Sequence, residues 1–391
     1  MERDLTTGSI GRNILKFSLP YFLSYFLQTL YGMADLFIIG QFNGVASTTA
    51  VSIGSQVMHM ITVMIVGIAM GTTVMIGKSV GAKQKKETSK IIGNTVSLFV
   101  CLSVVLTVVL LFFVHPIVRI MSTPQQAVEG TTAYLTICFA GIPLITAYNI
   151  ISSIFRGLGD SKSPMYFIAV ACGVNIVLDY VFIGGLHFGA SGAALGTTLA
   201  QTISVIVALI AIRKKDTGIS LKRSDLKPEG KTLKNILGIG IPISLQDGFI
   251  QISFIVITII VNQRGLNDAA AVGIVEKIIS FVFLVPSSML SAVSAIAAQN
   301  IGAGKDERAT KTLKYAIMIS MSFGLCVAVL MQFISNFVVG IFTVDTMVIH
   351  MGSQYIRSYI WDCMIAGIHF SYSGYFCAYA LSQTISTFVI S

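Results

Sequence analysis

The sequence predicts an all-α membrane protein, a bundle of transmembrane helices arranged as two pseudo-symmetric six-helix lobes in parallel repeat, with the second lobe truncated. Three observations lead to this fold class. Hydrophobic residues make up 54% of the 391 residues and charged residues only 11%, whereas soluble domains average about 25% charged residues. Apolar stretches long enough to cross a bilayer recur about ten times. Two parts of the chain also share motifs at a nearly constant separation.

Hydropathy places the expected transmembrane helices in order along the chain. Each has about 20 residues or more, the length that crosses a hydrocarbon core of about 30 Å. They are residues 14–39, 52–77, 91–114, 133–156, 164–186, 189–212, 236–261, 274–299, 313–342 and 353–380.

The loops between these spans alternate between basic and nearly uncharged. Of the 26 lysines and arginines, 22 fall in the five segments 3–16, 78–90, 156–162, 213–234 and 305–314. Positive residues near transmembrane helices stay on the cytoplasmic side. We therefore expect a multi-pass protein of the cell (plasma) membrane with a cytoplasmic N-terminus.

Repeated motifs indicate an internal duplication. The tripeptide Asn-Ile-Leu at 13–15 recurs 222 residues later at 235–237, and a proline follows each copy five residues on. The loop 77–83 recurs 221 residues later at 298–304, and a basic stretch follows each copy. Six crossings per copy give both copies the same orientation, which is a parallel repeat.

The duplication divides the chain into an N-terminal six-helix lobe at 1–212, a basic cytoplasmic linker at 213–235 and a C-terminal lobe at 236–391. A full second copy needs two more helices, in about 50 more residues. We therefore expect the C-terminal lobe to lack the last two of twelve helices.

Charge and motifs exclude several classes of function. The net charge of +9 is not gathered into the patch that a nucleic-acid groove requires, so no nucleic-acid partner is expected. The six cysteines fall in predicted helices without a CxxC pair, and we expect them to pack as apolar side chains. The sequence contains no HExxH and no aspartate-rich metal motif on a helix, so we do not expect an enzyme.

The fifth predicted span contains an amide and a carboxylate, Asn175 and Asp179. Because they are four residues apart, they lie one above the other on one helix face. A carboxylate in hydrocarbon costs at least about 2.5 kcal/mol, so it normally faces a cavity, a partner or an ion. A rise of about 1.5 Å per residue brings Asp35 of the first span and Thr197 of the sixth to the same level.

Carboxylate, amide and hydroxyl oxygens suit a small hard cation. We therefore interpret Asp35, Asn175, Asp179 and Thr197 as a binding site for Na+ or for a proton, between which the sequence does not decide. The alternative is that both aspartates are neutral, hydrogen-bond to their neighbours and hold helices together. Thr197 would then bond to its own helix.

Other polar residues and prolines fall inside the predicted spans. Glu276 and Lys277 adjoin in sequence but point about 100° apart, so we expect an inter-lobe or boundary role and no direct pair. His59 and His369 have no metal-like partner and are expected to be structural. Prolines remove a backbone hydrogen bond and allow a helix to bend. They are Pro20, Pro143, Pro242 and Pro286.

Three motifs in register with the duplication carry a family resemblance. They are Pro20 in the first span, the loop Gly77–Lys83, and the segment Arg156–Pro164 after the fourth span. From about residue 10 to 380, the chain resembles the multidrug and toxic compound extrusion (MATE) family. This resemblance implies a secondary antiporter that exports cationic or amphipathic drugs and toxins by alternating access, in exchange for Na+ or H+.

The resemblance also implies roles for individual residues. One branch of the family has a cation site in its N-terminal lobe, and its residue types match Asp35, Asn175, Asp179 and Thr197 one by one. Another branch places acidic residues on the seventh and tenth helices. Asp362 fits that pattern, whereas Asp247 stands at a different spacing from its proline.

By the same resemblance, Asp247 and Asp362 line the cleft and attract cationic substrate. The implied partners are small-molecule substrates and the lipid bilayer, with no cofactor besides the coupling ion. Two alternatives stay open. One is a flippase for a lipid-linked saccharide, which would favour a basic cleft, and the other is a non-transporting truncated remnant.

Overall fold

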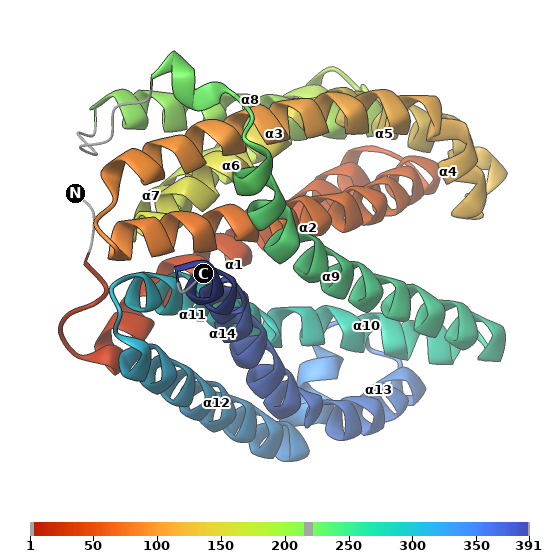
Figure 1. Cartoon of the computed structure of the whole chain (residues 1–391). Helices are drawn as coiled ribbons and strands as arrows, with labels where there is room; N and C mark the ends of the chain where they lie inside the picture. The colour runs from red at the N-terminus through yellow and green to blue at the C-terminus, as the bar shows by residue number, and fades with distance from the viewer. Residues whose placement is uncertain (1–3, 215–221, 390–391) are drawn as a thin grey trace.

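The computed structural model describes residues 4–214 and 222–389. Helices hold nearly all of these residues, and the described part of the chain contains no β-strand (Figure 1). The predicted all-α fold class is therefore confirmed.

The first lobe consists of eight α-helices with two short helical segments between them. They are α1 (Ile10–Phe42), α2 (Val45–Gly81), α3 (Lys85–Phe112), α4 (Val114–Ile120), the 3-10 turn η1 (Gln125–Ala127), α5 (Val128–Ala140), α6 (Ile142–Gly157), α7 (Lys162–Asp179), the π-helical turn η2 (Tyr180–Gly185) and α8 (Gly189–Lys214).

The second lobe follows the short 3-10 turn η3 (Arg223–Leu226). It contains α9 (Gly230–Arg264), α10 (Leu266–Val282), α11 (Leu284–Gly302), α12 (Asp306–Gly340), α13 (Thr346–Tyr359) and α14 (Asp362–Val389).

The apolar helices match nine of the ten predicted spans. Within the described residues, eight helices are long and apolar enough to cross a membrane, or nine if the bent pair 125–140 and 142–157 forms one span. These nine correspond to the first nine predicted spans. The tenth, 353–380, overlaps the end of α13 and most of α14, which are separate helices.

Prolines mark breaks at only two of the four predicted positions. Pro143 and Pro286 lie in the first turns of α6 and α11, and the helices on either side of Gly141 are bent by 49°. A missing N–H group is harmless there because the first turn has no intrahelical acceptor for it. Pro20 and Pro242 lie within α1 and α9, which continue through them.

The two lobes meet at one end of the molecule and diverge toward the other. In Figure 1 the first lobe lies above the second, and their helices separate toward the right. Contacts between the lobes gather in the C-terminal half of α2, where Gly67 packs on the backbone of Ser244 and Gly71 on that of Ile236. The joined end is the one that carries the basic loops.

Two glycines make this contact between the lobes reciprocal. A Cβ atom on Gly81 would collide with the carbonyl oxygen of Gln299, and a Cβ atom on Gly302 would collide with that of Lys78. Gly81 and Gly302 are equivalent positions of the duplication, and so are Lys78 and Gln299. The contact is therefore its own image under the pseudo-two-fold relation between the lobes, as in an isologous dimer interface.

The N-terminal segment crosses to the second lobe and reinforces the joined end. The Leu5 side chain is buried, its backbone N–H donates to Gln299 Oε1 at 3.2 Å, and Asn300 Nδ2 donates to its carbonyl at 3.4 Å. Gln299 Nε2 in turn donates to the Gly157 carbonyl in the first lobe at 3.1 Å. One glutamine thus ties together the N-terminal segment and both lobes.

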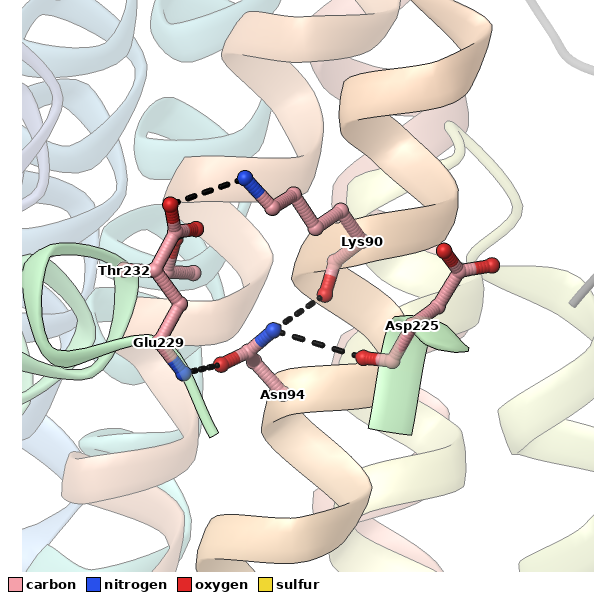
Figure 2. Close-up of polar contacts among 5 residues, drawn as sticks. All are labelled: Lys90, Asn94, Asp225, Glu229 and Thr232. Carbon is pink, nitrogen blue, oxygen red and sulfur yellow. Dashed lines mark hydrogen bonds and ion pairs between the residues drawn. The ribbon is translucent and has the colours of Figure 1, made fainter. Parts of the chain in front are cut away.

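Residues 222–229 run along α3 before α9 begins (Figure 2). Asn94 Oδ1 accepts from the Glu229 backbone N–H at 2.6 Å, and Asn94 Nδ2 donates to the Asp225 carbonyl at 3.4 Å. Lys90 Nζ lies 2.8 Å from Glu229 Oε1. The start of the second lobe is therefore fixed to the first lobe by α3.

Replacing Gly81 with alanine is expected to loosen the joined end, because the new methyl group meets a backbone carbonyl that cannot rotate away. We expect Gly81→Ala to lower the thermal unfolding midpoint in detergent by several degrees. Gly238→Ala is the matched control: it lies on an exposed helix face with nothing within 4 Å of the added Cβ, and alanine favours a helix by up to about 1 kcal/mol. Equal midpoints for the two variants would contradict the close packing.

The ion pair on α3 should be sensitive to pH. Hydrogen bonds from Lys90 and Thr232 lower the pKa of Glu229 below its ordinary value of about 4.3. Its contribution to stability is therefore present above that value and is lost as the pH falls through the lowered pKa. The difference in unfolding midpoint between wild type and Glu229→Gln should be small and salt-sensitive at neutral pH, because both side chains are partly exposed.

This difference should vanish once the pH has fallen below the lowered pKa of Glu229, since wild type is then protonated at the same position. Glu87→Gln on the same helix serves as the control. A difference between wild type and Glu229→Gln that persists in acid would show that the carboxylate charge is not what holds residues 222–229 on α3.

Candidate functional site

Two of the predicted site residues come from the last turns of α7. Asn175 and Asp179 lie on its buried face, with 1% and 0% of their surfaces exposed. Immediately after Asp179 the backbone widens into the π-helical turn Tyr180–Gly185. Such turns in helices are frequent at functional sites.

Asp35 of α1 and Thr197 of α8 complete the set. Asp35 is 3% exposed, and Thr197 Oγ1 donates a hydrogen bond to its Oδ2 at 3.3 Å. The Asp35 carboxyl group also lies within hydrogen-bonding reach of the Asp179 and Asn175 side chains. The structure therefore brings together all four residues, as the helix-rise argument predicted, in the interior of the first lobe.

Small residues on α8 make room for the Asp179 carboxylate. A Cβ atom on Gly196 would overlap Asp179 Oδ1, and one on Gly192, a turn earlier, would lie 3.2 Å from the backbone of Phe182 in the π-helical turn. Glycines four residues apart let two membrane helices approach closely. Our sequence analysis did not single out this Gly-x-x-x-Gly pattern, which would have identified the α8 surface that faces α7.

The buried oxygens of this site lack partners. Among the described residues, Asp35 Oδ1, both Asp179 oxygens and the Asn175 side-chain oxygen accept no hydrogen bond. Buried polar groups are normally paired, and a buried charge is especially costly when unpaired. Hydrogen bonding to neighbours, the alternative interpretation of the sequence, is present between Thr197 and Asp35. Asp35 is also within hydrogen-bonding reach of Asp179 and Asn175, so a proton on one carboxyl group would link these side chains directly.

The donor set suits a hard cation. Two carboxylates, an amide oxygen and a hydroxyl are the oxygen ligands that such ions prefer. The described residues contain no group of three or more His, Cys, Asp or Glu side chains that fits a metal ion, and nothing here resembles a zinc site. The same oxygens can also take up a proton, because two adjacent carboxylates repel each other when both are charged.

The two acidic residues proposed for the second lobe lie at different levels. Asp247 on α9 is half-buried and close to Cys377 of α14. Asp362, also half-buried, begins α14 beside Tyr359 and His369. Cys377 lies 15 residues after Asp362 along α14, about 22 Å at 1.5 Å per residue. The two carboxylates therefore do not form one site.

Comparisons with known proteins agree with this architecture. The sequence model of the MatE family matches residues 20–181 and 242–391. A crystal structure described as the outward-facing conformation of a multidrug resistance MATE family transporter of the MOP superfamily superposes with a TM-score of 0.89 and 25% identity. It covers 96% of this chain, which in turn covers 84% of it.

Two relatives by sequence are named for drug resistance. "Probable multidrug resistance protein YoeA" of Bacillus subtilis (strain 168) is 27% identical over 92% of this chain and 79% of its own length. "Multidrug export protein MepA" of Staphylococcus aureus (strain NCTC 8325 / PS 47) is 24% identical over 93% of this chain and 81% of its own length.

Gly196→Ala tests whether α8 seats the Asp179 carboxylate. The added methyl group must displace that carboxylate, so we expect a lower thermal unfolding midpoint. Gly173→Ala on α7, with nothing within 4 Å of the new Cβ, should be neutral or stabilising.

A double-mutant cycle isolates the contact between these two groups. In the double variant Gly196→Ala with Asp179→Ala, the methyl group no longer meets the carboxylate. The loss caused by Gly196→Ala should therefore largely disappear in that background. A fully additive loss would place the effect of Gly196→Ala elsewhere in α8.

Proposed function

Because the chain belongs to the MatE family, whose members are transporters and not enzymes, we propose that it is a cation-coupled antiporter. It exports cationic or amphipathic drugs and toxins across the cell membrane by alternating access. The basic end faces the cytoplasm, and the coupling ion is Na+ or H+.

The observation that carries this proposal is the pair of buried carboxylates, Asp35 and Asp179. Two unpaired carboxylates in a membrane interior are retained only if something offsets their charge. A positive ion bound between them does so, whereas an empty, fully charged pair is disfavoured. The names of the relatives support drug export as the process to which ion binding is coupled.

Ion occupancy connects three helices of the first lobe. Asp35 is supplied by α1, Asp179 by α7 and Thr197 by α8, so binding a cation draws these helices together. The N-terminal end of α1 and the segment before it lie against the second lobe, where Tyr25 Oη is 3.1 Å from Ser291 Oγ. A shift of α1 therefore reaches the contact between the lobes.

The joined basic end fits an outward-open state. In this arrangement the glycine contacts of Gly81 and Gly302 close the cytoplasmic side, while the lobes diverge toward the outside. Export also requires an inward-open state, in which the glycine contact between the lobes opens. An ion that binds from outside shifts the equilibrium toward whichever of the two states, outward-open or inward-open, binds it more tightly.

Na+ and a proton use the same oxygens. A proton on either carboxyl group reduces the negative charge that attracts Na+, so the two ions compete for the site. Efflux driven by a Na+ gradient should then fall as protons occupy the pair, which links both ions to one mechanism.

Substituting either carboxylate tests the coupling. We expect Asp35→Asn and Asp179→Asn each to reduce dye efflux from energised cells to the level of cells without the protein. The amide keeps the shape but removes the charge that binds the ion. The measurement uses fluorescent amphipathic dyes of positive, zwitterionic and negative charge, with membrane content checked by immunoblot.

Asp306→Asn, at the exposed start of α12, is the matched control and should transport like wild type. Dye efflux that both carboxylate variants retain, with an unchanged response to Na+ and proton gradients, would reject the coupling assignment.

A further inference from the structure

Equivalent helices of the two lobes carry matching exposed stripes. α2 spans Val45 to Gly81, and α10 with α11 spans Leu266 to Gly302, an offset of 221 residues at both ends. Near the start of each segment, three exposed residues follow one another at helical spacing. They are Ser52, Gln56 and His59 on α2 and, at equivalent positions, Gly273, Lys277 and Ser280 on α10.

These stripes lie where the lobes diverge. Further along each helix, exposure ends: Gly67 and Gly71 of α2 are buried against the second lobe, and α11 is almost wholly buried from Ser288 onward. In Figure 1, α2 belongs to the upper lobe and α10 to the lower lobe, and α9 runs between them. His59 of one stripe and Lys277 of the other lie within electrostatic range of each other. The two stripes therefore approach each other where the lobes diverge, and this region is called the opening between the lobes.

Lys277 places a positive charge deep within this opening. It lies 11 residues after the start of α10, about 16 Å along the helix, and its side chain is exposed. No carboxylate of the described residues forms an ion pair with it. Its neighbour in sequence, Glu276, is turned toward the second lobe, where Thr258 Oγ1 donates to it at 3.5 Å.

His59 faces this lysine from the other lobe. It is exposed on α2 and lies within electrostatic range of Lys277. That His59 is structural stays a prediction. Its closeness to Lys277 could not be predicted from the sequence, because helical periodicity does not show that α2 and α10 approach each other at this level. Two basic side chains from opposite lobes thus share the opening.

Next to Lys277, on the side of the joined end, two aromatic rings from the two lobes are in contact. One turn beyond Lys277, the ring of Phe281 contacts that of Phe26 on α1, with centroids 6.1 Å apart. This contact joins the lobes on the side of the closed end. Glu276, next to Lys277 in the sequence, interacts with it electrostatically but accepts a hydrogen bond from Thr258, and within the described residues the two do not form an ion pair.

We propose that Lys277, with His59 opposite, binds the anionic group of an amphipathic substrate whose apolar part rests on Phe26 and Phe281. This inference rests on the proposed transport function and adds that, among its amphipathic substrates, those with an anionic group bind at Lys277. A lysine at this depth in a membrane protein normally lies toward a water-filled path or an ionic partner. A carboxylate or sulfonate on the substrate provides that partner.

The test uses a matched pair of probes and equilibrium binding, so it requires no ion gradient. Two dansyl amides with the same alkyl linker end in a carboxylate in one case and in a trimethylammonium group in the other. Fluorescence titration of the purified full chain in nanodiscs gives a Kd for each. Wild type should bind the carboxylate probe more tightly.

Lys277→Gln copies the residue at the equivalent position 56 of the first lobe. It should weaken the carboxylate probe about tenfold, which is about 1.4 kcal/mol, and leave the trimethylammonium probe unchanged or tighter. The double variant Gln56→Lys with Lys277→Gln returns the charge to the opening from the facing lobe. It should restore binding of the carboxylate probe.

Three results would overturn the proposal. In the first, wild type binds the trimethylammonium probe more tightly than the carboxylate probe. In the second, Lys277→Gln changes the Kd of both probes equally, and in the third, the double variant does not recover binding of the carboxylate probe although it melts like wild type. The outcome is separate from that of the coupling assignment. Asp35→Asn and Asp179→Asn should lose efflux but still bind the carboxylate probe at Lys277. If Lys277 does not bind the probe, the coupling assignment is unaffected, because it is tested by efflux in the two aspartate variants.

Discussion

Two carboxylates buried together govern the arrangement of the first lobe. Asp35 and Asp179 come from α1 and α7, and three of their four oxygens have no hydrogen-bond partner among the described residues. Their approach requires a glycine at position 196, a widened turn after Asp179 and a hydroxyl at Thr197. Each of these features is explained if the pocket holds a positive charge, because burial of the bare pair is otherwise too costly.

The duplication supplies the second constraint. The equivalent glycines Gly81 and Gly302 pack on the backbone carbonyls of Gln299 and Lys78, which are themselves equivalent residues of the two lobes. The two lobes therefore share one interface and close at one end. Since backbone rather than flexible side chains forms this contact, it has few intermediate arrangements. An interface of this kind favours discrete open and closed states, which is what alternating access requires.

The two lobes have equivalent backbones but carry different charged side chains. The exposed positions on α2 and α10 match one another, yet the first lobe has Gln56 where the second has Lys277. Inside the lobes it is the first lobe that carries the charged groups, since the paired carboxylates Asp35 and Asp179 belong to it. The interior of the first lobe and the region between α2 and α10 therefore carry side chains of opposite charge, with Asp35 and Asp179 in the former and Lys277 in the latter.

The sequence by itself determined the helical class, the order of the first nine apolar spans, the duplication and the set of polar residues that could meet inside the first lobe. These follow from hydropathy, from repeated motifs and from the cost of burying a carboxylate, all of which are local. Only the tertiary structure decided that Asp247 and Asp362 stand apart, that Gly196 seats Asp179 and that His59 faces Lys277. Those facts depend on how helices from distant parts of the chain are rotated and stacked, and helical periodicity within one segment carries no information about its neighbour.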